Sequence, residues 1–125
     1  MAERKGKFLV YVDKKGEYRF TLKASNGEPI GLSEGYSSKA ACLNGVEAVR
    51  KHSAKAEIVN ESEGKCPKFE VYKDKAGEFR FRLIASNGEP ILASEGYSVK
   101  ASAIGGCEAV IRYSADAVLE EKEKE

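Results

Sequence analysis

The heptapeptide ASNGEPI occupies Ala24–Ile30 and appears again, unchanged, at Ala85–Ile91, which lies 61 positions further along the chain. The match extends well beyond these seven residues. When residues 7–61 are laid over residues 68–122, about 32 of the 55 positions are identical. A match of this length at one fixed offset is typical of the tandem duplication of a supersecondary unit. The 125-residue chain is therefore predicted to contain two copies of one folding unit.

Each copy of the heptapeptide holds an Asn-Gly pair between two strand-like stretches. A two-residue hairpin loop in a type I′ turn requires positive φ at both central residues, which Asn followed by Gly tolerates. We therefore predict hairpin tips at Asn26-Gly27 and at Asn87-Gly88. The proline two residues after each glycine fits the first position of a strand, where a missing N–H costs least. The repetition is interpreted as duplicated turn chemistry.

The residues around the heptapeptide change their pattern in the same order in both copies. In the first copy, FLVYV is a short β-rich stretch and EYRFTL alternates between apolar and polar residues, as a half-buried strand does. After the heptapeptide, SEGYSSKAACLNGVEAVRKHS is predicted to form a helix, in which the small Gly45 allows close approach to a sheet. A short apolar stretch, AEIV, follows. Each copy thus predicts three strands, a helix and a final strand.

The segment FEVYKDKAGEFRFRLIASNGEPILASEGYSVKASA, from Phe69 to Ala103, resembles the YegP-like family of small bacterial proteins of uncharacterised function. The resemblance covers both copies. It implies an α+β fold in which two β(3)-α-β repeats share one antiparallel-rich sheet, with a helix from each repeat packed on one face. It further implies that the C-terminal strands are exchanged between the repeats. It carries no activity that can be assigned to particular residues.

The predicted organisation is a first repeat over residues 7–61, a linker over 62–67, a second repeat over 68–120 and a charged tail over 121–125. A single copy of about 55 residues buries only a marginal core, whereas two copies can close one. We therefore expect the two repeats to form one structural unit, a monomer with internal pseudo-twofold symmetry.

The composition excludes some classes of function. Lys and Arg number 21 against 20 Asp and Glu. This balance argues against nucleic-acid binding driven by bulk positive charge, although it allows a local basic patch. No apolar stretch has the length of a signal peptide or a membrane helix, so we expect no membrane association. Three cysteines without a CxxC pair favour free thiols in a bacterial cytoplasm.

The first candidate surface is the polar face of the predicted sheet, which we call the open face. Aromatic and guanidinium groups on such a face can stack on bases and pair with phosphates, as single-stranded nucleic acid requires. Alternating polar residues on a solvated strand face are, however, also ordinary antiparallel design. The predicted binding surface consists of Tyr11, Arg19, Lys23, Tyr72, Arg80 and Arg82.

The second candidate is an anion site at the start of each predicted helix. Backbone N–H groups at a helix N-terminus favour negative charge. Here they would be joined by Ser37 and Lys39 in the first copy and by Ser98 and Lys100 in the second. Ser37 or Ser38, and Ser98, also serve as predicted helix caps, and capping alone explains these serines.

The inventory of reactive residues favours a protein that is not an enzyme. His52 is the only histidine and aligns with Tyr113, and no catalytic triad, metal-ligand cluster or phosphate-binding loop has the required spacing. Glu34 and Glu95 are interpreted as structural hydrogen-bond acceptors. We predict a binding module without cofactors, whose partner is a protein or a small molecule. Single-stranded nucleic-acid binding, and an enzyme whose site is dispersed in the sequence, remain the alternatives.

Overall fold

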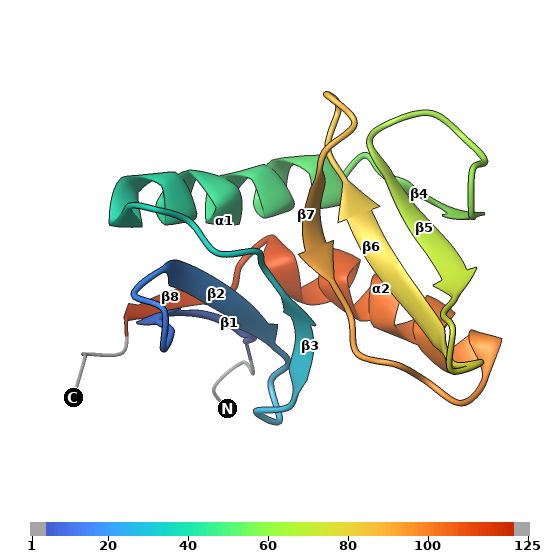
Figure 1. Cartoon of the computed structure of the whole chain (residues 1–125), viewed down its shortest axis with the longest axis horizontal. Helices are drawn as coiled ribbons and strands as arrows, with labels where there is room; N and C mark the ends of the chain where they lie inside the picture. Colours follow the sequence, from blue (N-terminus) through green and yellow to red (C-terminus); the bar gives the residue numbers. More distant parts are fainter. Residues whose placement is uncertain (1–4, 122–125) are drawn as a thin grey trace.

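A computed structural model describes residues 5–121 as one eight-stranded mixed sheet with two helices on one face (Figure 1). The strand order is β4-β5-β6-β7-β3-β2-β1-β8. The first repeat provides β1 (Lys7–Val12), β2 (Tyr18–Lys23), β3 (Pro29–Leu32), α1 (Lys39–Ser53) and β4 (Glu57–Asn60). The second repeat provides β5 (Lys68–Lys73), β6 (Phe79–Ile84), β7 (Pro90–Ala93), α2 (Lys100–Ser114) and β8 (Val118–Glu121).

The last strand of each repeat belongs to the sheet half built by the other repeat. β4 pairs with β5 in parallel, and β8 pairs with β1 in parallel, whereas the other pairings are antiparallel. The two halves meet where β3 lies beside β7, at the pair Leu32 and Ala93. These two positions are equivalent in the duplication, so the pseudo-twofold axis passes between them. The predicted α+β fold, with its exchanged C-terminal strands, is confirmed.

One continuous core lies between the sheet and the helices. The alternation in β1, β2, β5 and β6 points one phenylalanine from each strand toward the helices, and all four rings are fully buried. They meet edge to face in pairs, Phe8 with Phe20 and Phe69 with Phe81. Cys42 and Cys107 complete this core as small buried residues, while Cys66 is exposed. Glu121 ends β8, and the remainder of the predicted tail, residues 122–125, lies outside the described residues.

The hairpin tips differ from the predicted two-residue turns. The N–H of Gly27 donates to Ala24 O and the N–H of Ala24 donates to Glu28 O, each at 2.9 Å. Gly27 has φ +88°, but Ser62 is the only non-glycine residue with positive φ among the described residues, so Asn26 has negative φ. The loop is therefore a three-residue turn closed by a glycine bulge. The type I′ prediction was wrong, because the asparagine side chain instead accepts the N–H of Glu28.

Replacing Gly27 or Gly88 by Val should destabilise the protein by more than about 1 kcal/mol, because a β-branched residue is strained at positive φ. A Cβ atom at either position has no atom within 4 Å, so the loss of stability would come from backbone strain and not from a side-chain clash. Replacement by Asn, which tolerates this conformation, should cost less. Urea unfolding of the four variants measures this. Equal stability of the Val variants and the parent protein would contradict the bulged turn.

Two adjacent glycines in α2 offer a test of close packing. A Cβ on Gly106 would lie 2.6 Å from Cε2 of Phe81 and 2.9 Å from the Tyr97 hydroxyl, whereas a Cβ on Gly105 meets nothing within 4 Å. Gly106→Ala should therefore destabilise by about 1 to 3 kcal/mol through overpacking. Gly105→Ala should stabilise by up to about 1 kcal/mol, because alanine has the higher helix propensity. Thermal unfolding of both variants should show melting temperatures that move in opposite directions.

Candidate functional site

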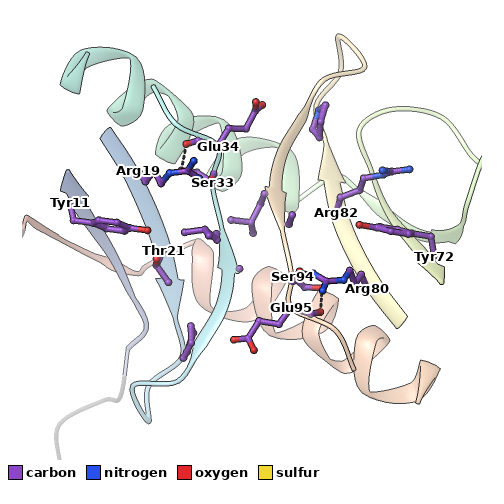
Figure 2. Close-up of a pocket in the computed structure, with 16 residues that line it drawn as sticks. Tyr11, Arg19, Thr21, Ser33, Glu34, Tyr72, Arg80, Arg82, Ser94 and Glu95 are labelled. Atoms are coloured by element: carbon purple, nitrogen blue, oxygen red, sulfur yellow. Dashed lines mark hydrogen bonds between the residues drawn. The ribbon is translucent and has the colours of Figure 1, made fainter. Parts of the chain in front are cut away.

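A hollow of about 760 Å³ lies in the middle of the open face, on the side of the sheet opposite the helices (Figure 2). We call it the central groove. β3 and β7 form its floor, where the exposed Leu32 and Ala93 lie beside Gly31 and Leu92. Because the pseudo-twofold axis passes through the floor, each repeat supplies one half of the groove.

The groove collects most of the predicted open-face residues. Tyr11 and Tyr72 flank it from β1 and β5, and Arg19, Arg80 and Arg82 lie along it. Lys23 does not line it, because this lysine lies at the far end of β2, opposite Lys7. Strand alternation thus predicted the face on which these side chains lie.

The arginines Arg19 and Arg80 are held by carboxylates that the sequence pattern did not reveal. Arg19 donates from Nε to Asp13 at 2.7 Å and from a terminal nitrogen to Ser33 O at 3.0 Å. The same Asp13 carboxylate accepts two N–H groups of its own turn. The hydrogen bond from Arg19 and these backbone bonds lower the pKa of Asp13. Arg80 is held in the same way by Asp74 and Ser94 O.

Arg82 is the main departure from symmetry in the groove. It donates to the buried Glu70 at 2.7 and 2.8 Å, and its guanidinium lies 4.5 Å from the centre of the Tyr72 ring. Burial acts to raise the pKa of Glu70, but hydrogen bonds from Ser62 and Arg82 outweigh it, so the pKa is lowered. The equivalent of Arg82 in the first repeat is Thr21, which lines the other side.

Glu34 and Glu95 stand at opposite ends of the groove (Figure 2). Among residues 5–121, neither carboxylate has a hydrogen-bond or salt-bridge partner. The main-chain carbonyls of both residues instead accept the hydroxyls of Ser33 and Ser94. The interpretation of the two glutamate side chains as structural acceptors was therefore wrong. Each follows its floor residue, Leu32 or Ala93, by two positions, which places both carboxylates on the open face.

Of the two helix starts at which anion sites are predicted, one has a side-chain cap. Ser38 caps α1 by accepting the N–H of Ala41 at 3.1 Å, and Val99 precedes α2 without a side-chain cap. Neither Ser37 nor Ser98 is a cap, because each lies one residue too early.

The lysines at these helix starts bind the exchanged strands. Lys39 pairs with Glu121 of β8, and Lys100 donates to Asn60 of β4 at 2.6 Å. The two partners occupy equivalent positions in the two repeats.

The chemically reactive residues lie away from the groove. Burial raises the pKa of Cys107 to about 12 and also raises that of Cys42, so both remain thiols at neutral pH. His52 lies 3.4 Å from the hydroxyl of Ser86, just as its counterpart Tyr113 contacts Ser25. Within residues 5–121, no three His, Cys, Asp or Glu side chains are grouped to bind a metal ion, and neither helix is long and apolar enough to cross a membrane.

Comparisons with known proteins agree with this architecture. A family model described as a domain of unknown function (DUF1508) matches twice, over residues 13–60 and 74–121. A UPF0339 protein encoded in the ptx operon 5′ region of Stutzerimonas stutzeri is 39% identical over 116 residues, which are 93% of this chain and 96% of that protein. A UPF0339 protein of Treponema denticola is 54% identical over 54 residues, which are 43% of this chain and 93% of that protein. Some relatives therefore consist of a single repeat.

A solved structure shares the whole fold. The solution NMR structure of YegP from E. coli, described as a protein of unknown function, is similar with a TM-score of 0.81 and 27% identity. The match covers 98% of this chain and 97% of YegP. A Yersinia pestis relative, the UPF0339 protein YegP, is 34% identical over 116 residues. The chain therefore belongs to the UPF0339 family, which includes YegP, and contains two copies of its repeat of unknown function.

Proposed function

We propose that this protein is a non-enzymatic binding module of the cytoplasm, and that its ligand lies in the central groove. The observation that carries the proposal is the position of the hollow, at the centre of the open face where both repeats contribute equivalent residues. Internal hydrogen bonds already fix the arginines that line it, so little side-chain entropy is lost when a ligand binds.

The charge pattern supports a protein or small-molecule ligand over nucleic acid. Each arginine in the groove has a carboxylate partner within 2.8 Å, while Glu34 and Glu95 would repel phosphates. An enzyme is disfavoured because the histidine and the buried cysteines lie outside the groove. The exposed Cys66 is compatible with a reducing compartment.

A ligand-independent test uses isotope-labelled protein and two fractions of native lysate, one of small molecules and one of proteins. We expect amide NMR signals of β3 and β7 to shift with one of the fractions. The control is Ala93→Trp, which fills the floor of the groove and should abolish the shifts while the fold is retained. Shifts confined to the helical face, or shifts that persist in the Ala93→Trp variant, would contradict the assignment of the groove.

Nucleic acid gives a distinct prediction. Titration with labelled single-stranded RNA or DNA at low salt should show no saturable binding at protein concentrations of tens of micromolar, on the order of weak non-specific affinities. If binding does occur, removing Arg82 should reduce the slope of log affinity against log salt concentration by about one unit. Removing Tyr72 should lower the affinity but leave this slope unchanged. Saturable binding with both signatures would restore the nucleic-acid alternative.

A further inference from the structure

The charges that line the central groove do not cancel. Three arginines line it, and each is paired with carboxylates outside the lining. Arg19 pairs with Asp13 and Arg80 with Asp74. Arg82 pairs with Glu61 and with Glu70, which Lys68 shares, so this group of two cations and two carboxylates is also balanced. The lining glutamates, Glu34 and Glu95, have no cationic partner among residues 5–121. The groove therefore presents two uncompensated negative charges, and a complementary ligand carries two positive ones.

The strand geometry fixes the separation of these charges. Leu32 and Ala93 lie opposite each other on antiparallel strands. Glu34 comes two positions after Leu32, and Glu95 comes two positions after Ala93. Because the strands run in opposite directions, the two glutamates lie four residues apart along the strands. At roughly 3.3 Å per residue, the two glutamate Cα atoms are about 13 Å apart along the strands. Alternate side chains of an extended peptide point to one side, so its positions i and i+4 are also separated by about 13 Å.

The floor between the two glutamates is apolar. Leu32, which lies at the centre of this floor, is 41% exposed. Exposed apolar surface of this kind is covered favourably by another apolar side chain, at position i+2 of the same peptide. The ring of Tyr11 flanks the floor and can pack against the aliphatic part of lysine or arginine. On the other side, Arg82 already lies against the Tyr72 ring.

We propose that the central groove binds an extended peptide segment with basic side chains at positions i and i+4 and an apolar side chain at i+2. The inference rests on the proposed function and specifies its ligand. Because the groove is nearly twofold symmetric, the segment fits in either direction, with the apolar side chain over Leu32 and Ala93 in both. In this proposal the segment belongs to a partner protein, and it lies on the face of the sheet without adding a strand to it.

The experiment uses the full chain and a capped heptapeptide with lysine at its second and sixth positions, leucine at the fourth and serine elsewhere. We expect saturable NMR shifts at β3 and β7, and affinity that falls with salt. Glu34→Gln and Glu95→Gln should each weaken binding about threefold, as exposed ion pairs do, and the double variant about tenfold. Glu47→Gln/Glu108→Gln removes the same number of charges from the helices and should leave affinity unchanged.

Further peptides separate this inference from the proposed function. Binding of equal strength by a peptide with glutamine in place of both lysines would overturn the charge requirement while the groove remains a binding site. Equal binding by spermine, with the same dependence on Glu34, would show that two positive charges suffice without a peptide backbone or an apolar side chain, and would overturn the peptide assignment. Absence of shifts with the basic peptide would overturn the inference, and the lysate fractions would then decide separately whether the groove binds anything.

Discussion

Residues 1–62 and 63–125, produced as separate chains, should give no folded monomer from either half. Each half lacks the strand that completes its own sheet, because β4 lies on β5 and β8 lies on β1. A chain of about 60 residues can bury only about 60% of its surface even when its fold is complete. Removal of the partner half would in addition expose a sheet edge and one side of the core.

Reciprocal contacts between the halves strengthen this expectation. The buried hydroxyls of Ser53 and Ser114 meet at 2.7 Å across the pseudo-twofold axis. The end of each helix reaches the β2-β3 or β6-β7 hairpin of the other repeat, through His52 to Ser86 and Tyr113 to Ser25. These contacts join the end of each helix to the other repeat, in addition to the exchanged strands.

Single-repeat relatives indicate how an isolated half can still fold. The Treponema denticola relative has about the length of one repeat. Two identical copies could exchange their last strands just as the two repeats do here, so a half should be either unfolded or dimeric. Light scattering coupled to gel filtration, with melting curves at several concentrations, distinguishes these states. A monomeric half with a sharp, concentration-independent transition would contradict the shared core, while mixing both halves should restore the intact fold.

The repeat and the order of its elements could be predicted because local signals agree with the fold. Phe20 and Leu22 alternate with polar neighbours, and the small Gly45 lies buried on the inner side of α1. The turn type was missed because Asn-Gly is compatible with more than one loop, and the choice depends on how the flanking strands pair. Here the pairing of β2 with β3 shifts register between Leu22 and Lys23, which accompanies the bulged turn.

The groove could be predicted only in part, since it depends on how the two repeats meet. Alternation placed Arg19 and Tyr11 on one face, but their sequence positions do not show that Asp13 neutralises the guanidinium. Nor do they show that β3 and β7 adjoin, which brings Glu34 and Glu95 to the ends of one hollow. The first fact depends on how the β1-β2 hairpin closes and the second on long-range strand pairing. Together they support the basic peptide segment proposed above as the ligand.

Arg50 is a second residue whose importance long-range packing alone reveals. Its guanidinium donates to three main-chain carbonyls at and just beyond the end of α2, Ser114 O and Ala115 O at 3.2 Å and Ala117 O at 2.8 Å. It also lies 5.1 Å from the centre of the Phe8 ring. A cation there provides hydrogen bonds to the last carbonyls of α2 and interacts favourably with the negative end of the dipole of that helix. In this way α1 fixes the turn that leads into the exchanged strand β8.

Replacing Arg50 by Ile should destabilise the protein by more than about 2 kcal/mol, because hydrogen bonds from a charged donor are lost and partly buried carbonyls lose their partner. Isoleucine is the matched choice, since Ile111 occupies the equivalent position in α2 and is compatible with the fold there. Arg50→Lys should recover less than half of the loss, because one ammonium group cannot reach three carbonyls in the geometry of the guanidinium fork. Urea unfolding at constant m-value measures these changes, with Ile111→Ala as the control expected to cost less than about 1 kcal/mol. Should Arg50→Ile unfold at the same urea concentration as the parent protein, the packing of β8 against β1 would not depend on this contact, and the exchanged strand would be held by its ladder alone.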